Sequence, residues 1–467
     1  MKVDEWNRRI GLLFLLAVMI LLLPHSIRTL SGNNTFIGKE AYFDIKSANE
    51  IIKGVKDFKE ITSYQIIIIF LLKFLKTYAL LRVIPLILGI LTLYFCKKFL
   101  EIIRLKSRAR FFVILCLVLS SFFVSTFTIS SQRALTSFLF VLLLYLIYKK
   151  RKEWSLINLT SLLLALSGFW NALYTGMIFF VYSRSKKIDG KKIIWPIMII
   201  LFSLTLVYLP QVFIEKPEFI EQNYLKSFLS DFGGINGIGT FSILLACVGL
   251  LKVWKFKRKN YFLYASSIAV VIASFFFNEL IIYSQLIIIF LAGMGFNYFY
   301  KTKWEADYLK QGFILVLFCG LLFSTVSDAI NVGQMQPNLK KMEAFSWLKE
   351  NSSKESIVFS DYRNGLWIEY FGDRAVVLDE RMGKTSNKRF NDSYTLLNTY
   401  DMNQAKEVIN KYEIDYIIVT KKMFEGDVWE REELGLHFLL GNKENFKLKF
   451  NNSEVWMWKY IGASLDE

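Results

Sequence analysis

The chain has 467 residues, of which 54% are hydrophobic, and a formal net charge of +17. So apolar a composition excludes an ordinary soluble globular protein. The apolar residues fall in long runs as far as Ile330, whereas charged and polar residues return at ordinary density from Asn331 onward. We therefore expect a polytopic α-helical membrane domain at 1–330 and a soluble domain at 331–467.

The positive charge belongs to the membrane part of the chain. Residues 331–467 contain 19 Lys and Arg against 22 Asp and Glu, whereas the preceding 330 residues contain 38 against 18. The basic residues stand in short stretches between apolar runs and not on one face of a folded domain, which argues against nucleic-acid binding. The partner that this charge pattern indicates is the lipid bilayer.

The apolar runs predict about eleven membrane-spanning helices. Their ranges are 10–24, 78–97, 110–128, 133–148, 156–168, 169–183, 193–212, 237–254, 261–278, 280–300 and 311–330. The further apolar segment Gln65–Lys76 is only about a dozen residues long and contains two lysines, so we expect it to be an interfacial helix. All four cysteines fall inside apolar runs, where they predict packing and neither disulfides nor a metal cluster.

The basic loops alternate along the chain and so predict its orientation. Lys97–Arg110, Lys149–Lys152, Arg184–Lys192 and Lys252–Lys259 are rich in Lys and Arg, which places them on the cytoplasmic side. The N-terminus is then inside, and the loop 25–77 and the domain 331–467 are outside. We expect a multi-pass protein of the cytoplasmic membrane, in the cell envelope.

The terminal part alternates helical and extended patterns, which is typical of an α/β domain. We expect helices at 338–351, 403–412 and 428–440, strands at 356–360, 375–378 and 416–420, and a hairpin within 446–460.

Two carboxylates stand in the first predicted outer loop. Glu40 and Asp44 are four residues apart, shortly after the first span and just before an interfacial helix expected at Ile45–Ile52. On a helix, that spacing puts both on one face, where they could hold a divalent cation or divide the roles of acid and base. The alternative is that they are solvated charges on a loop.

The layout of the chain resembles the GT-C glycosyltransferase superfamily, and within it the catalytic subunits of archaeal and eukaryotic oligosaccharyltransferases. The resemblance consists of a first span, a long outer loop with an acid in the Glu-x-Tyr-aromatic setting Glu40–Phe43, many further spans, and an outward α/β domain. It implies a membrane glycosyltransferase that takes a sugar from a polyprenyl-phosphate-linked donor. The acceptor, a protein or a glycan, would receive the sugar at the outer membrane face, as in protein glycosylation.

The resemblance also implies roles for residues. Glu40 would take the place of the family's first-loop acid, as a base towards the acceptor or, with Asp44, as a ligand of Mg²⁺ or Mn²⁺. Arginines near predicted outer ends could pair with the carrier phosphate, and acids after the seventh span could contact substrate. The expected substrate-binding residues are Tyr42, Arg28, Arg133, Glu218, Glu221 and Asp231.

Two features depart from the oligosaccharyltransferases. The turn Ser130–Arg133, between the third and fourth spans, has no carboxylate where that group has a second acidic motif. Ser360–Gly365 has only a loose likeness to the Trp-Trp-Asp motif with which that group reads its acceptor. Three alternatives therefore stay open: a metal-independent GT-C enzyme, a non-catalytic membrane scaffold or assembly protein, and a transporter of a lipid-linked substrate.

Overall fold

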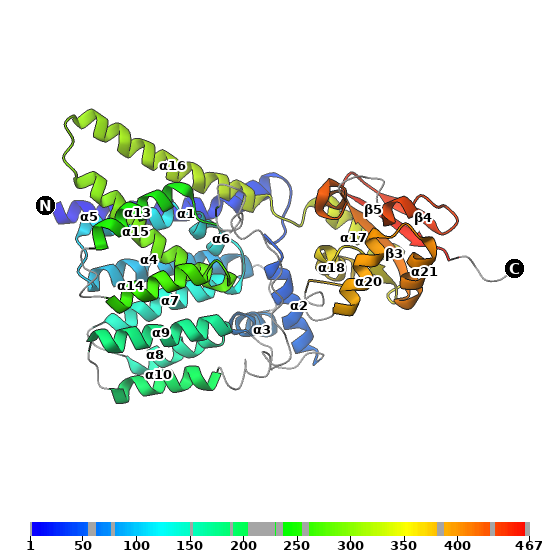
Figure 1. The fold of residues 1–467 in the computed structure, drawn as a ribbon, viewed down its shortest axis with the longest axis horizontal. Helices are drawn as coiled ribbons and strands as arrows, with labels where there is room; N and C mark the ends of the chain where they lie inside the picture. Colours follow the sequence, from blue (N-terminus) through cyan, green and yellow to red (C-terminus); the bar gives the residue numbers. More distant parts are fainter. Residues whose placement is uncertain are drawn as a thin grey trace. The chain divides into compact units, whose positions relative to one another are not determined.

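The computed structural model of the chain describes residues 2–54, 62–75, 80–149, 153–186, 190–203, 229, 237–254, 261–380, 387–429 and 435–462. The chain divides into two compact units, Met1–Met335 and Gln336–Glu467. The first is a bundle of helices, and the second is a sheet with helices around it (Figure 1). The expected helical membrane architecture of the first unit is confirmed.

Four described helices are long and apolar enough to cross a membrane. They are α1 (Lys2–Leu30), α4 (Leu80–Ile102), α15 (Ile281–Lys301) and α16 (Asp307–Gly333). A fifth candidate is the pair α5 (Ser107–Val118) and α6 (Ser121–Thr128), whose axes differ by 58°. Ser120 causes this break, because its backbone is extended and its side chain caps α6 by accepting a hydrogen bond from the Phe123 N–H at 3.2 Å.

The remaining helices of the bundle are shorter. They are α7 (Gln132–Tyr148), α8 (Trp154–Ala165), α9 (Phe169–Lys186), α10 (Gly190–Ser203), α13 (Thr240–Val253) and α14 (Tyr261–Ala273). Each expected span overlaps one of these helices or the longer ones. By length and composition the described helices give four or five crossings, so the number of eleven stays a prediction.

Helix α15 packs so closely on its neighbours that only glycine fits at three contacts. A Cβ atom on Gly249 of α13 would lie 1.9 Å from the Leu291 carbonyl oxygen, and one on Gly295 would lie 2.0 Å from the Leu245 carbonyl oxygen. On the α5 side, a Cβ on Gly293 would lie 2.4 Å from the Val113 Cα. Small residues at helix interfaces are typical of membrane proteins, in which van der Waals contact between backbones holds helices together.

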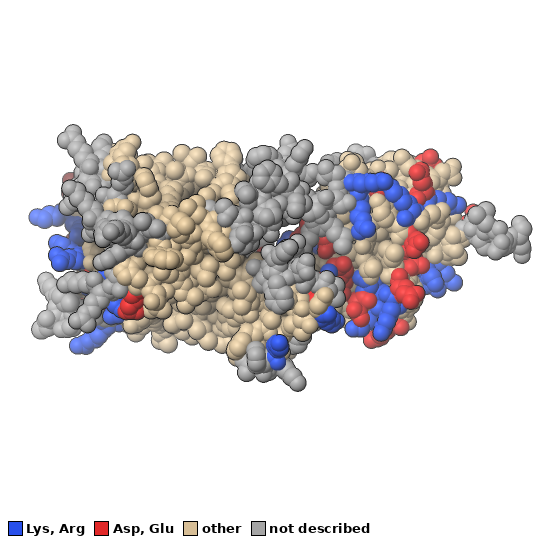
Figure 2. All heavy atoms as spheres, turned by 90° about the horizontal axis from the view of Figure 1, so that it is seen from below, with Lys and Arg blue, Asp and Glu red and all other residues tan. Residues whose placement is uncertain are grey.

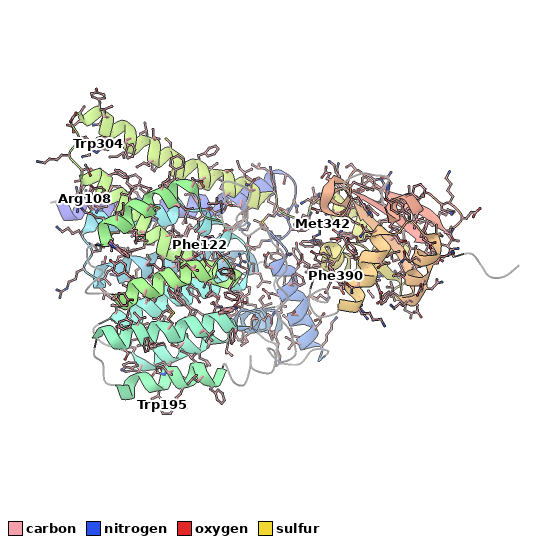
Figure 3. The ribbon with its side chains drawn as sticks, viewed as in Figure 1. Arg108, Phe122, Trp195, Trp304, Met342 and Phe390 are labelled. Atoms are coloured by element: carbon pink, nitrogen blue, oxygen red, sulfur yellow. The ribbon has the colours of Figure 1, made fainter. Side chains whose placement is uncertain are left out.

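The outward surface of the bundle suits lipid, and its charge gathers at one end. Figure 2 shows the sides of the helical unit largely without charged atoms and a group of Lys and Arg at the end that lies on the left. Lys301 there lies within electrostatic range of Arg108, Lys106 and Lys252, which come from two of the chain's basic segments. Figure 3 shows Arg108 at that end and Trp195 pointing outward, with 69% of its surface exposed.

Helix α2 (Glu40–Ile52) lies across the other end of the bundle, beside α3 (Ser63–Leu75) (Figure 1). The helix expected at Ile45–Ile52 therefore begins five residues earlier than predicted. The reason is Gly38, whose φ of +77° is open to glycine and ends the preceding loop. Glu40 and Asp44 thus lie on a helix and not on a loop.

The second unit is built on a mixed five-stranded sheet in the order β2-β1-β3-β5-β4. Strand β1 (Ile357–Phe359) pairs in parallel with β2 (Ala375–Val376) and β3 (Ile414–Thr420). Strands β4 (Phe446–Asn451) and β5 (Val455–Tyr460) form the hairpin, and β5 continues the sheet antiparallel to β3. Phe359, Ile417 and Val419 are buried at its centre, against residues of the flanking helices.

The expected strands, the hairpin and the helices α17 (Leu339–Asn351) and α21 (Met402–Lys411) are confirmed. The helix expected at 428–440 is confirmed at α22 (Leu436–Leu439), whereas Val428 and Trp429, which follow a π-turn at Met423–Asp427, are not helical. Residues 430–434 of that range lie outside the described residues. Three helical segments were not predicted, namely α18 (Tyr362–Trp367), the following π-turn Ile368–Gly372, and α20 (Asn387–Asn398). Their sequences are too polar or too short to show a clear helical period.

Lys341, in the first turn of α17, is buried with 2% of its surface exposed. Burial lowers the pKa of Lys341 from 10.5 to about 8, and nearby Lys422 and Arg363 act in the same direction against Glu454 and Asp427. The fall corresponds to about 3 kcal/mol of disfavour for the charged form.

Replacing Lys341 with methionine is therefore expected to stabilise the terminal unit at pH 7, by up to about 3 kcal/mol. At that pH the lysine is charged in both the folded and the unfolded chain, and only the folded chain buries the charge. Between about pH 8 and 10.5 the folded protein loses the proton first, so the advantage of the variant shrinks. Thermal unfolding followed by tryptophan fluorescence across this range measures it, with the exposed neighbour Lys340→Met as the control; an equal gain at every pH would contradict the assignment.

Candidate active site

The loop between α1 and α2 is held by Arg28, near the end of α1. Its guanidinium donates hydrogen bonds to the Thr35 hydroxyl at 2.6 Å and to the backbone oxygens of Thr35 and Phe36 at 3.2 and 3.1 Å. It also donates to the carbonyls of Gly333 and Met335, at 3.2 and 2.6 Å. The residue expected to bind the carrier phosphate is thus engaged with neutral oxygens of the protein, and in this structure it shapes the loop.

Tyr42 also shapes the loop. Its side chain is 2% exposed, its hydroxyl accepts a hydrogen bond from the Phe36 N–H at 3.0 Å, and its ring packs edge-on against Phe36 at 5.7 Å. Burial raises the pKa of Tyr42, so the hydroxyl stays protonated at neutral pH. Both Arg28 and Tyr42 therefore hold the loop that precedes Glu40 in place through hydrogen bonds.

Glu40 is the first residue of α2, and one of its oxygens is buried. A Cβ atom on Gly38 would lie only 2.8 Å from Glu40 Oε2, so the carboxylate lies directly against the backbone of the loop. Among the described residues Glu40 Oε2 has no hydrogen-bond partner. A buried carboxylate oxygen without a partner is costly in a folded protein and calls for an explanation, of which a functional role is one. The interpretation of Glu40 as a solvated surface charge does not fit this position.

Asp44, one turn further along α2, has a different environment. Its Oδ1 accepts a hydrogen bond from the Gln65 side chain of α3 at 3.0 Å, and only 9% of its surface is exposed. The neighbouring Tyr64 hydroxyl lies 2.5 Å from the Ser130 Oγ. Burial, together with the charge of Asp44, raises the pKa of Tyr64. Asp44 therefore belongs to a polar network that joins α2 and α3 to the turn before α7.

The same network fixes the turn Ser130–Arg133. The Gln132 side chain accepts from the Tyr64 N–H at 2.9 Å and donates to the Ser63 hydroxyl at 2.9 Å. Ser63 in turn lies 2.9 Å from the Ser167 hydroxyl. These bonds hold the start of α7 in place, and Arg133 is the next residue after Gln132.

Arg133 is a cation within electrostatic range of Glu40. Two carboxylates, Glu40 and Glu279, act electrostatically on its guanidinium. Arg133 makes no hydrogen bond or ion pair within 4 Å to any residue in the described part of the chain. A guanidinium carries five N–H donors in one plane, an arrangement that suits the oxygens of an anion.

Glu279 is a further candidate site residue, which the sequence analysis did not single out. It lies in the turn η5 (Asn278–Leu280) between α14 and α15, and its side chain is exposed. A Cβ atom on Gly168 would lie 3.0 Å from Glu279 Oε2 and 3.2 Å from Asn171 Nδ2. The Glu279 carboxylate and the Asn171 amide therefore both lie beside Gly168. Asn171 accepts a hydrogen bond from the Tyr283 hydroxyl at 2.7 Å. The signal in the sequence was a single acid between two long apolar runs.

The expected Mg²⁺ or Mn²⁺ site at Glu40 and Asp44 stays a prediction. In the structure Asp44 Oδ1 accepts a hydrogen bond from Gln65, and the acid that acts on Arg133 together with Glu40 is Glu279. Within the described ranges, no group of three or more His, Cys, Asp or Glu side chains could hold a metal ion. The other expected substrate contacts, Glu218, Glu221 and Asp231, lie outside the described residues.

No protein-family model matches the sequence, and no curated protein sequence matches it either. Solved structures do match. The oligosaccharyltransferase AglB of Archaeoglobus fulgidus, solved with an inhibitory peptide and a dolichol-phosphate, superposes with a TM-score of 0.60 at 12% identity, over 98% of this chain and 75% of its own. The same protein, solved with Zn and sulfate, gives a TM-score of 0.60 at 12% identity, over 95% and 72%.

A second similar structure is ArnT of Cupriavidus metallidurans bound to undecaprenyl phosphate. Its TM-score is 0.56 at 9% identity, over 99% of both chains. These proteins are GT-C glycosyltransferases, and the present chain has their fold. The expected resemblance is thereby confirmed at the level of architecture.

Proposed function

We propose that this protein is a GT-C glycosyltransferase that moves a sugar from a polyprenyl-phosphate-linked donor to a protein or glycan acceptor at the outer membrane face. The observation that carries the proposal is the pairing of Glu40, whose Oε2 is buried and unpartnered, with Arg133, whose donors are free of other described residues. The fold supports it, because structures of this fold have been solved with dolichol-phosphate and undecaprenyl phosphate.

The proposed roles follow from the charges. Glu40 accepts the proton of the acceptor hydroxyl or amide as its oxygen or nitrogen attacks the sugar C1. The bond between C1 and the phosphate oxygen breaks, and the polyprenyl phosphate leaves with the electron pair of that bond. Arg133 donates hydrogen bonds to the phosphate oxygens, whose negative charge grows in the transition state. Asp44 and Tyr42 hold α2 and the loop, and Arg28 holds the loop to the end of α16.

The proposed orientation has the basic end of the bundle in the cytoplasm and α2 with α3 at the outer face. The α/β unit at 336–467 then lies outside, in a position to meet an acceptor. Protease protection of tags placed at the N-terminus and after residue 462 tests this arrangement.

The enzymatic proposal is tested with the purified full chain in liposomes. Undecaprenyl-phosphate-linked and dolichyl-phosphate-linked hexoses, labelled in the sugar, are supplied with an envelope extract of the source cells as acceptor. We expect transfer of label to the extract together with release of polyprenyl phosphate. Binding of these lipids without release of polyprenyl phosphate would instead favour a scaffold or a transporter.

A further inference from the structure

The chemistry proposed above requires positive charge at the donor phosphate. As the bond between the sugar and the phosphate breaks, the leaving phosphate gains negative charge, which a divalent cation or a fixed guanidinium can stabilise. In this chain the turn between α6 and α7 offers no carboxylate to a metal and offers Arg133 in its place. Arg133 is therefore the residue of this turn that could supply the positive charge.

The placement of Arg133 is fixed by neighbours that do not use its charge. The side-chain oxygen and nitrogen of Gln132 both form hydrogen bonds with residues of α3, and the Ser130 hydroxyl forms one with Tyr64. The side chain of Arg133 itself is left without a bond to another described residue. A guanidinium on such an anchored turn loses little freedom when it binds a phosphate in a bidentate manner.

The two carboxylates that act electrostatically on Arg133 come from separate parts of the chain. Glu40 follows the loop that Arg28 holds, and Glu279 lies over Gly168 in the turn before α15. The positive charge of the Arg133 guanidinium stabilises both carboxylates in the absence of a metal ion. The same charge would repel a divalent cation that approached them. Asp44, the acid on the same helix, is engaged by Gln65.

We propose that Arg133, with Glu40 and Glu279 as its two carboxylate neighbours, serves as the resident cation of the site, so that sugar transfer proceeds without a divalent metal. Arg133 contacts the donor phosphate, and Glu279 is a positioning residue that acts through Arg133. The bonds that form and break are those of the proposed transfer reaction. The acceptor proton passes to Glu40, and the polyprenyl phosphate leaves with the electron pair of the bond to the sugar. This inference rests on the proposed function.

The first experiment measures release of polyprenyl phosphate by wild-type protein in EDTA and in Mg²⁺ or Mn²⁺. We expect rates equal within about twofold. Arg133→Gln is expected to lose at least about 100-fold in rate, and Arg133→Lys to retain a measurable part, because it keeps the charge but not the bidentate geometry. Arg108→Gln, at the basic end of the bundle, is the matched control and keeps the wild-type rate. A rate that EDTA abolishes and Mn²⁺ restores would overturn the inference while leaving the proposed function intact.

The second experiment reads metal binding without turnover. Electron paramagnetic resonance is used to measure Mn²⁺ bound to the purified chain. We expect wild type to bind no Mn²⁺ at Glu40, and Arg133→Gln to gain a Mn²⁺ site that Glu40→Gln removes. Binding of Mn²⁺ to the wild type that is lost in Glu40→Gln would overturn the inference, whether or not the donor is turned over. A lack of donor turnover would be a separate result and would count against the proposed function.

The third experiment separates positioning from folding. Glu279→Gln is expected to raise the KM for the donor about tenfold with a smaller change in kcat, and Glu279→Asp to restore most of it. Thermal unfolding of both variants should match wild type, since the Glu279 side chain is exposed. Loss of stability with an unchanged KM would assign Glu279 to the scaffold and remove it from the site.

Discussion

Replacing Glu40 with glutamine is expected to reduce the rate of sugar transfer by about 10²- to 10⁴-fold. Glutamine keeps the size of the side chain and its place against Gly38 but cannot accept the acceptor's proton. The buried Oε2 has no hydrogen-bond partner among the described residues, so the substitution breaks no bond that holds the loop. The loss should therefore fall on kcat, with the affinity for undecaprenyl phosphate and the thermal stability close to wild type.

The matched control for this variant is Glu153→Gln. Glu153 is an exposed acid before α8, and its ion pair with Lys149 on the surface contributes little to stability. It tests the effect of removing one carboxylate from the same chain. Wild-type transfer by Glu40→Gln would exclude Glu40 as the base, whatever the behaviour of the control.

Replacing Gly249 with alanine is expected to destabilise the bundle by about 3 kcal/mol. The new methyl group would lie 1.9 Å from the Leu291 carbonyl oxygen, so α13 and α15 must move apart along the contact that Gly295 shares. Backbone atoms cannot rotate away as a side chain can, and the close packing of membrane helices is lost with them. Thermal unfolding of the detergent-solubilised chain measures the change.

Gly312 in α16 provides the control for this prediction. A Cβ atom there meets nothing within 4 Å, so Gly312→Ala should be neutral or slightly stabilising, as alanine favours a helix. Equal unfolding temperatures for the two variants would show that the α13 and α15 contact tolerates side chains and that its glycines have another cause.

Much of the fold could be predicted from the sequence, because hydrophobic runs and strand patterns are local. The helices at 338–351 and 403–412 and the hairpin at 446–460 were readable in this way. The start of α2 was not, since it depends on the left-handed backbone of Gly38, which composition does not show. The polar α20 has no apolar period strong enough to identify it.

The site could be predicted only in part, for a related reason. Glu40 and Arg133 stood out as charged residues beside spans, and the structure brings both into one electrostatic group. Glu279 could not be joined to them, because its nearness depends on how α9, α14 and α15 pack. The prediction that Glu40 and Asp44 lie one turn apart on a helix is confirmed. The hydrogen bond from Gln65 to Asp44 was not predicted, because it depends on how α2 and α3 pack.

The bonds of Arg28 have a consequence for the order in which the protein matures. Two of the oxygens that hold it belong to Gly333 and Met335, which are synthesised some three hundred residues later. During synthesis the loop before Glu40 therefore lacks these two hydrogen bonds until α16 has left the ribosome and entered the membrane. A chain truncated before α16 would have Glu40 and Arg133 but would lack the clasp that sets the loop, so catalytic competence is expected to arise only once the membrane part is complete.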